Sequence, residues 1–186
     1  MAHGYVDDKQ ALLARLGRYG SHGGKEREAV QLNLLLGRIE QQYKGKHKVT
    51  VARRDPCTVK ADAEGLEQAL VHLVQNGIEA SGGNSPVFLD LRREGGSAIV
   101  EVVDSGEGMT PEFIRTRLFK PFHSSKAGGF GIGAFEAREL VRAMGGQLDV
   151  ESREGLGTRF IVRLPLNETA EMIRTMNRHE QASEVA

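Results

Sequence analysis

The chain of 186 residues has a single cysteine, no net charge and no long apolar run. Cys57 has no partner for an internal disulfide and belongs to no CxxC pair, which fits a reducing cytosol. The 25 basic and 25 acidic residues cancel, which argues against a broad electrostatic surface for nucleic acid or for an anionic membrane. No apolar run approaches a bilayer span, and no signal peptide is evident. We therefore expect a cytoplasmic fragment without membrane contact of its own, and leave open whether a longer protein is membrane-anchored.

The chain does have the apolar content of one well-packed domain, because 39% of its residues are hydrophobic and 27% are charged. Its periodicity predicts helices over 7–19, 26–43, 62–81, 110–119 and 134–146. Alternation of apolar and polar residues predicts strands over 47–53 and 58–61, and hairpins over 86–104 and 147–166. Helices that interleave with mostly antiparallel strands indicate a two-layer α/β sandwich.

The helix expected over 62–81 carries two distinct faces. Its apolar stripe, which we expect in the core, consists of Leu66, Leu70, Leu73, Val74 and Gly77. His72, Asn76 and Glu79 fall within about 60° of one another on an adjoining face. A polar trio beside a core stripe is also what the solvated side of an amphipathic helix looks like, and taken alone that is the better interpretation.

A carboxylate follows the second strand of the first hairpin. The sequence from residue 100 to 109 is VEVVDSGEGM, so an apolar strand ends in Asp104, followed by Gly106 and Gly108. A carboxylate there can accept a hydrogen bond from an exocyclic amine, and the glycines let the backbone approach a flat ring. An acidic turn whose glycines supply positive φ angles explains the same residues equally well.

A glycine-rich stretch precedes the helix expected from residue 134. Gly128, Gly129, Gly131 and Gly133 leave backbone N–H groups and a positive helix end available for a phosphate, and Lys126 adds a point charge. A simple hinge is the alternative. In the last hairpin the turn GLGT leads to Thr158, which is placed to bond near a purine or simply belongs to an ordinary turn.

The order of these segments resembles a known family. An Asn-bearing helix, DxGxG, an F-P-F segment, GxGxG before a helix and GxGTxF resemble the N, G1, F, G2 and G3 boxes of the ATP-binding domain of bacterial sensor histidine kinases. The five segments here are HLVQNGIEAS, DSGEGM, LFKPFHSSK, GGFGIG and GLGTRF. The chain is thus identified as a member of the GHKL superfamily of gyrase, chaperone, kinase and mismatch-repair ATPases, and is most similar to the PrsK type. The resemblance implies a Bergerat-type fold, a mixed, mostly antiparallel sheet packed on helices.

The resemblance also implies roles for single residues. Asn76 would supply the protein oxygen to Mg²⁺, Asp104 would read the adenine amino group, and Lys126 would cover the terminal phosphates. Asn76, Lys126 and His72 are the candidate catalytic residues, and Asn76 is the candidate metal ligand. The nucleotide-binding residues that the resemblance implies are Asn76, Glu79, Ala80, Asp104, Gly106, Gly108, Met109, Lys126, Gly129, Phe130, Gly131, Ile132, Gly133 and Thr158.

Two positions depart from the family pattern. His72 stands where many members have Asn or Glu four residues before the metal-binding Asn, and a Glu there is the general base of the ATPase branches. Strong intrinsic hydrolysis is therefore not expected, and His72 either bonds a phosphate or water, which we favour, or fills space. Phe130 stands where Thr or Leu is common, and it packs a closed lid or anchors the loop.

The phosphoacceptor histidine that such a kinase needs is missing from this sequence. None of the six histidines has the expected helical context with a following acidic residue. We therefore expect residues 44–166 to form the ATP-binding catalytic domain of a protein-histidine kinase, with little turnover in isolation. Residues 1–43 would comprise an expression remnant, the end of a preceding helical region and a linking helix, and 167–186 a polar tail.

The implied ligands are ATP or ADP with Mg²⁺, and the implied partners are a dimerisation domain with the phosphoacceptor histidine and a response regulator. No nucleic acid partner is expected. Two alternatives stay open: a degenerate GHKL module that binds nucleotide or protein, and a GHKL serine kinase of the anti-sigma type.

Overall fold

The computed structural model describes residues 26–82, 85–121 and 132–168. In chain order the elements are β1 (Glu28–Gln31), α2 (Leu32–Tyr43), β2 (Val49–Arg54), β3 (Thr58–Ala61), α3 (Ala63–Ala80), β4 (Val87–Glu94), β5 (Ser97–Asp104), α4 (Pro111–Phe113), the π-helical turn η1 (Ile114–Leu118), α5 (Gly133–Ala143), β6 (Gln147–Arg153) and β7 (Gly157–Pro165). None of these helices is long and apolar enough to span a membrane.

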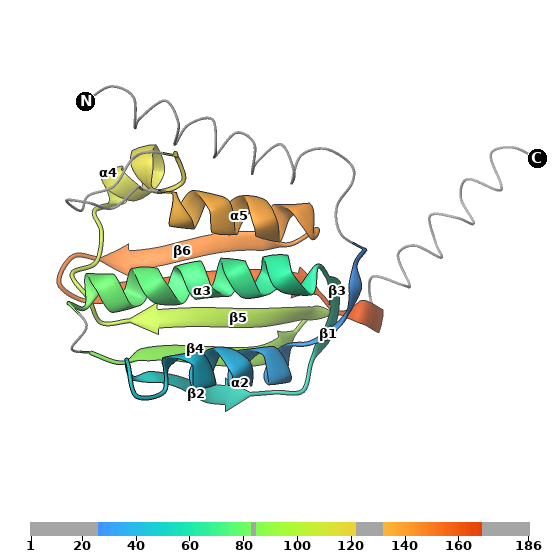
Figure 1. Ribbon diagram of the computed structural model, residues 1–186. Coiled ribbons are helices and arrows are strands. Elements are labelled where there is room, and N and C mark those ends of the chain that lie inside the picture. Colours follow the sequence, from blue (N-terminus) through green and yellow to red (C-terminus); the bar gives the residue numbers. More distant parts are fainter. Residues whose placement is uncertain (1–25, 83–84, 122–131, 169–186) are drawn as a thin grey trace, which may run out of the picture.

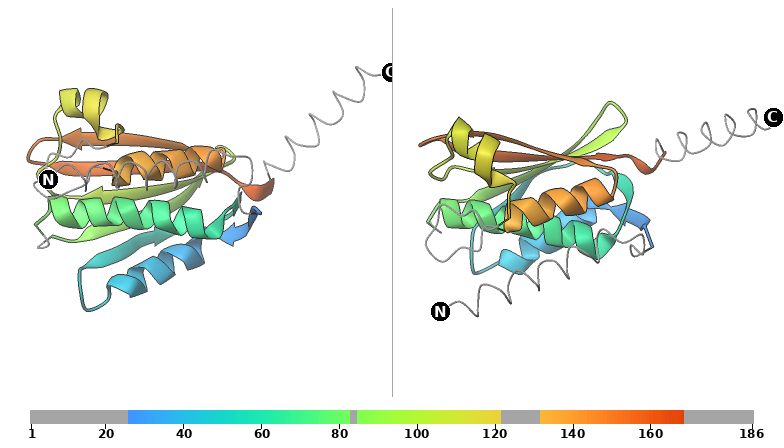
Figure 2. Two further views of the ribbon diagram at one scale, coloured as in Figure 1. Left: turned by 45° about the horizontal axis from the view of Figure 1, so that its top comes forward. Right: turned by 90° about the horizontal axis from the view of Figure 1, so that it is seen from above.

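The described elements form two layers. A five-stranded sheet has the order β2-β4-β5-β7-β6, and only β2 and β4 run parallel. A separate two-stranded ribbon joins β1 to β3. The helix α3 crosses the middle of the sheet between α5 and α2 (Figure 1), and from above all three helices lie on one side of it (Figure 2). The predicted two-layer sandwich with a mixed, mostly antiparallel sheet is confirmed.

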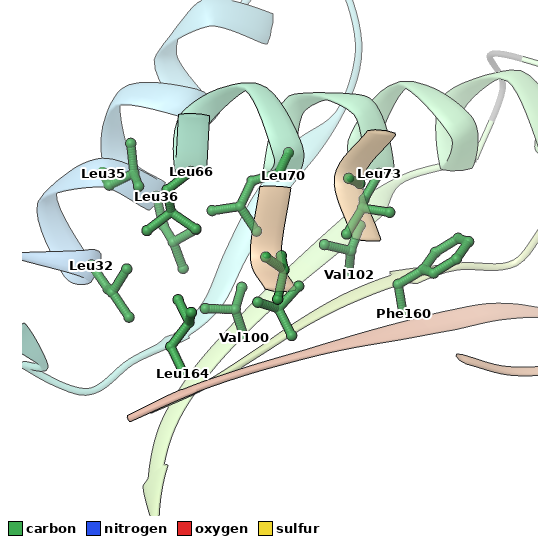
Figure 3. Close-up of a cluster of buried hydrophobic side chains, with 14 of the residues drawn as sticks. Leu32, Leu35, Leu36, Leu66, Leu70, Leu73, Val100, Val102, Phe160 and Leu164 are labelled. Atoms are coloured by element: carbon green, nitrogen blue, oxygen red, sulfur yellow. The ribbon is translucent and has the colours of Figure 1, made fainter. Parts of the chain in front are cut away.

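The core lies between the sheet and the helices. On α3 the side chains at helical spacing are Leu66, Leu70 and Leu73, and each is completely buried. Figure 3 shows these leucines above Val100, Val102, Phe160 and Leu164 of the central strands. Four side chains of α2 are equally buried and belong to the same cluster: Leu32, Leu35, Leu36 and Ile39. The predicted domain boundary at residue 44 stays a prediction, but the core already includes α2.

The opposite face of the sheet is charged. Arg92 of β4 lies 2.7 Å from the Glu101 carboxylate of β5, and Arg159 of β7 lies 3.5 Å from the other oxygen of Glu101. Arg92 also lies 3.5 Å from Asp90 on its own strand. Ion pairs join neighbouring strands on this face, where Ile99 of β5 is also buried. The hydrophobic core cluster of the described residues lies on the helical side.

Several helices and strands were predicted correctly from local sequence signals. The Asp62 carboxylate caps α3 by accepting a hydrogen bond from the Gly65 N–H at 3.2 Å, as expected from its position before the helix. The predicted hairpins form, and Gly95 and Gly96 make the first turn with φ angles of 53° and 78°. The helix expected from residue 134 is α5, which ends before Gly145 with a φ of 78°.

Two of the predicted helices were wrong in part. The helix expected over 26–43 begins only at Leu32, because residues 28–31 form β1 and pair antiparallel with β3. The Leu32 N–H then donates to the Cys57 carbonyl at 2.9 Å, which ties the helix start to that ribbon. The helix expected over 110–119 is only a short α4 that passes into a π-helical turn. The helix predicted over 7–19 and the polar tail beyond 168 lie outside the described residues.

Candidate functional site

The carboxyl end of β5 meets the C-terminal half of α3, at the left of Figure 1. There Asp104 is buried, with 6% of its surface exposed. Its Oδ1 atom accepts a hydrogen bond from the Gly106 N–H at 2.8 Å. The other carboxylate oxygen lies against Gly77 of α3, since a Cβ atom on Gly77 would be 3.4 Å from Oδ2. Strand and helix thus present a buried carboxylate beside a residue that adjoins Asn76.

The glycines after Asp104 are required by close backbone packing. A Cβ atom on Gly106 would lie 2.6 Å from the Ala80 carbonyl, and the Glu107 N–H donates to that carbonyl at 3.2 Å. Gly108 has a φ of 70°, and a Cβ atom there would come within 2.0 Å of the Arg153 carbonyl oxygen. The loop is therefore held between the end of α3 and the turn of the last hairpin.

The predicted residue Thr158 lies beside Asp104 in the sheet. It is 6% exposed and pairs with Asp104 across β5 and β7. Its Oγ1 atom lies 2.9 Å from the Ser152 hydroxyl oxygen, and that oxygen accepts the Met109 N–H at 2.9 Å. The Ser152 hydroxyl also donates to the Gly157 carbonyl. Ser152 was missed, although it stands opposite Thr158 in the predicted hairpin.

The polar face of α3 points toward the start of α5. A Cβ atom on Gly133 would lie 3.4 Å from Asn76 Oδ1 and 3.9 Å from the Cβ atom of His72. Both side chains are half-buried, whereas Glu79 is exposed and accepts a hydrogen bond from Gln75 at 3.2 Å. The structure therefore brings His72 and Asn76 together under α5 and leaves Glu79 on the surface.

A buried acid in the first turn of α5 contacts this face and was not predicted. Glu136 is 3% exposed, and its Oε1 accepts a hydrogen bond from Gln68 Nε2 at 2.9 Å. Its Oε2 lies 3.5 Å from Nδ1 of His72. The only sequence signal was an acidic residue near a helix N-terminus, which the helix dipole alone explains.

The segment before residue 122 is anchored to α5 by an arginine. Arg138 donates to the Phe119 carbonyl at 3.1 Å, and its guanidinium lies 4.5 Å from the centre of the Phe119 ring. Burial lowers the pKa of Arg138, and the nearby Arg142 lowers it further. Lys126, Gly129, Phe130 and Gly131 were predicted to bind nucleotide, but they lie in 122–131, outside the described residues.

The remaining predicted residues surround the same place. Ala80, Met109 and Ile132 are half-buried, at the end of α3, after the Gly108 turn and immediately before α5. Within the described ranges, no group of three or more His, Cys, Asp or Glu side chains is arranged to hold a metal ion. The predicted Mg²⁺ site needs only the one amide oxygen of Asn76.

A family comparison agrees with this geometry. The profile described as "Histidine kinase-, DNA gyrase B-, and HSP90-like ATPase" matches residues 61–168, which include Asn76, Asp104 and Thr158. The chain belongs to this family. ATP binding is the property that the family name carries, and the buried carboxylate with its glycines lies within the matched range.

Curated relatives carry the names of a sensor histidine kinase and of a sensor protein. Sensor histidine kinase ZraS of Klebsiella oxytoca is 38% identical over 112 residues, which is 60% of this chain and 24% of that protein. The C4-dicarboxylate transport sensor protein DctB of Rhizobium meliloti is 31% identical over 165 residues, 87% of this chain and 26% of that protein. The chain spans about a quarter of the length of these relatives.

Solved structures show the same fold. The nucleotide-free catalytic domain of histidine kinase ThkA is 28% identical with a TM-score of 0.66, covering 77% of this chain and 97% of that one. The mycobacterial sensor histidine kinase MprB is 26% identical with a TM-score of 0.64, covering 76% of this chain and 98% of that one. The predicted class, an ATP-binding catalytic domain of the sensor-histidine-kinase type, is confirmed over the alternatives of a degenerate module or an anti-sigma-type serine kinase.

Proposed function

We propose that this chain holds MgATP so that its γ-phosphoryl group is transferred to a histidine on a separate dimerisation domain. The observation that carries the proposal is the junction of β5 and α3. It brings the buried Asp104 carboxylate against Gly77, the residue after Asn76. A group suited to a purine amine and one suited to a metal-bound phosphate thus lie at the same part of α3.

Asp104 would recognise the adenine. A carboxylate can accept several hydrogen bonds, so the bond from the Gly106 N–H is compatible with another from an exocyclic amine. Burial strengthens such a bond, because water competes less well for the carboxylate. Ala80, Met109, Ile132 and Thr158 would then line or close the purine site, with Gly106 and Gly108 shaping its floor.

Asn76 would hold the Mg²⁺ ion. Mg²⁺ prefers oxygen ligands and keeps several waters, so a single amide oxygen together with phosphate oxygens suits it. The residues fit this role because Gly133, with no side chain, leaves open the space that a Cβ atom would occupy 3.4 Å from Asn76 Oδ1. When bound, the ion would offset charge on the phosphates. We propose that Lys126 and the amides of residues 122–131 also offset charge on the phosphates.

Phosphoryl transfer of this kind depends on positioning and charge neutralisation. This chain would fix the nucleotide, and the attacking imidazole and its base would come from the dimerisation domain. We further propose that the full-length protein is a sensor kinase that passes the phosphoryl group to a response regulator, as the names of the relatives suggest. The domain limits at 44 and 166 and the likeness to the PrsK type stay predictions.

Calorimetric titration tests the binding function. We expect MgADP and a non-hydrolysable MgATP analogue to bind in the micromolar range, and Asp104→Asn to abolish both. In this variant the side-chain amide presents an NH₂ group to the purine amine, at the place where the Asp104 carboxylate would accept a hydrogen bond. Asp149→Asn is the matched control, since Asp149 lies on the edge strand β6 and accepts from Gln147. Failure of the unmodified chain to bind either nucleotide would refute the proposal and leave a protein-binding module on an ATPase scaffold.

A further inference from the structure

Glu136 is a buried charged residue whose two oxygens both face α3. With 3% of its surface exposed, its carboxylate contacts Gln68 through Oε1 and His72 through Oε2. Burial of a charge is unfavourable unless polar partners compensate it, and here α3 supplies two of them. Ala137 and Leu140 on the same helix are buried apolar residues, so packing of α5 on α3 does not itself require an acid at position 136.

The contact fixes one side of the His72 imidazole. Nδ1 is buried and lies 3.5 Å from the Glu136 carboxylate, while 27% of the side chain is exposed. The exposed part therefore belongs to the other atoms of His72. A carboxylate beside Nδ1 favours the tautomer with a proton on that nitrogen and fixes the orientation of the ring.

The position of His72 along α3 indicates what this imidazole faces. Asp104 and Gly106 pack on α3 at Gly77 and Ala80, which defines the adenine end of the site. Asn76 lies next to this end, and His72 lies one turn further on, about 6 Å along the helix axis. If a nucleotide binds with its base at Asp104 and its metal at Asn76, His72 is the next polar residue along α3 in the direction of the terminal phosphates.

We propose that Glu136 is a positioning residue that holds His72 against the terminal phosphate, so that the site favours a nucleoside triphosphate over a diphosphate. The inference rests on the proposed function, because it presupposes a nucleotide between Asp104 and Asn76. With both ring nitrogens protonated, His72 would donate one hydrogen bond to Glu136 and one to the γ-phosphate, a group that a diphosphate lacks. Glu136 stands three residues after Gly133 on α5, so the placement of that helix also sets the orientation of His72.

The test compares affinities for MgADP and a non-hydrolysable MgATP analogue by calorimetry. We expect Glu136→Gln to weaken analogue binding about three- to tenfold and His72→Ala about tenfold, with MgADP binding changed by less than about twofold, since one charge-assisted bond is lost. In the double variant, Glu136→Gln should add little to His72→Ala, because the two residues act through one contact.

Two matched control variants alter a glutamate and a histidine that lie away from the contact between Glu136 and His72. Glu139→Gln lies on the same helix, where Glu139 pairs with Arg142 at 3.3 Å, and His47→Ala removes an exposed histidine before β2. Neither should change the ratio of the two affinities. A structural role for Glu136 would lower stability or both affinities together, and would leave their ratio unchanged.

The outcomes separate this inference from the proposed function. If the unmodified chain binds neither nucleotide, the proposed function fails. If it binds both and the affinity ratio is unchanged in Glu136→Gln and His72→Ala, the positioning role is overturned while the proposed function stands. Should Glu136→Gln fail to fold by circular dichroism, His72→Leu carries the test, since it changes a half-buried side chain to one of similar size without a hydrogen-bonding group. A preserved ratio in that variant overturns the inference equally.

Discussion

The two ends of the candidate site are built in different ways. At the end that we propose binds adenine, the loop after Asp104 is held by backbone contacts, with Gly106 on the Ala80 carbonyl and Gly108 on the Arg153 carbonyl. At the phosphate end, the described contacts are between side chains, above all His72 and Glu136. Backbone clamps do not depend on which side chains are present, whereas a side-chain pair is easily exchanged. The adenine end is thus fixed by the fold, and the phosphate end is open to adjustment.

The largest effect is expected when a side chain is added where the backbone of the Asp104 loop contacts the Arg153 carbonyl. Gly108→Ala would place a Cβ atom within 2.0 Å of the Arg153 carbonyl, at a φ of 70°. We expect a loss of roughly 3 kcal/mol or more in the free energy of unfolding, measured by denaturant titration, and loss of binding of both nucleotides. Gly155→Ala is the control, because it has a φ of 74° but no atom within 4 Å of the added group. That variant should lose only about 1 kcal/mol. Equal losses in the two would show that the clamp does not matter.

Removal of Asn76, the proposed metal ligand, should affect only the proposed phosphate end. Asn76→Ala should weaken binding of the MgATP analogue about tenfold, through loss of one metal contact of roughly 1.4 kcal/mol. Chelation of Mg²⁺ should weaken the unmodified chain similarly and change the variant little, while adenosine binds both equally. Calorimetry with and without Mg²⁺ provides the measurement. If nucleotide binding by the variant depends on Mg²⁺ as strongly as binding by the unmodified chain, Asn76 does not bind the metal.

The smallest expected effect lies at the adenine end, where one hydroxyl supports the clamp. Ser152→Ala removes the acceptor of the Met109 N–H and the partner of Thr158. We expect a loss of about 1 kcal/mol in unfolding free energy and a similar weakening of MgADP and analogue binding. Ser97→Ala at the opposite end of β5 is the control. A change in the affinity ratio would mean that the two ends are not independent.

The loop that follows Asp104 could be located from the sequence because its signals are local, whereas its role in adenine binding is implied by the family resemblance and stays a prediction. Asp104 closes an alternating strand, its glycines follow directly, and Thr158 follows a turn of its own hairpin. The cap at Asp62 and the core stripe of α3 likewise depend on residues within a few turns. The roles of Lys126 and Phe130 stay predictions, since they lie outside the described residues.

The wrong start of the helix expected from residue 26 and the failure to predict the role of Glu136 have one physical cause. Residues 28–31 form a strand because β3, almost thirty residues later, supplies the hydrogen-bonding partner, and a helical pattern alone does not reveal that. Glu136 looks like an acid that favours a helix N-terminus until α3 is packed against it.

Periodicity, capping and turn residues by themselves determined the order of most helices and strands, the core stripe of α3 and the position of the turn after Asp104. Tertiary structure alone decided which face of α3 meets α5, and therefore that His72 is held by Glu136 and that Asn76 lies under Gly133. The reason is that local backbone preferences act over a few residues. A contact between two helices depends on the shape and charge of surfaces that come together only when the sheet has formed.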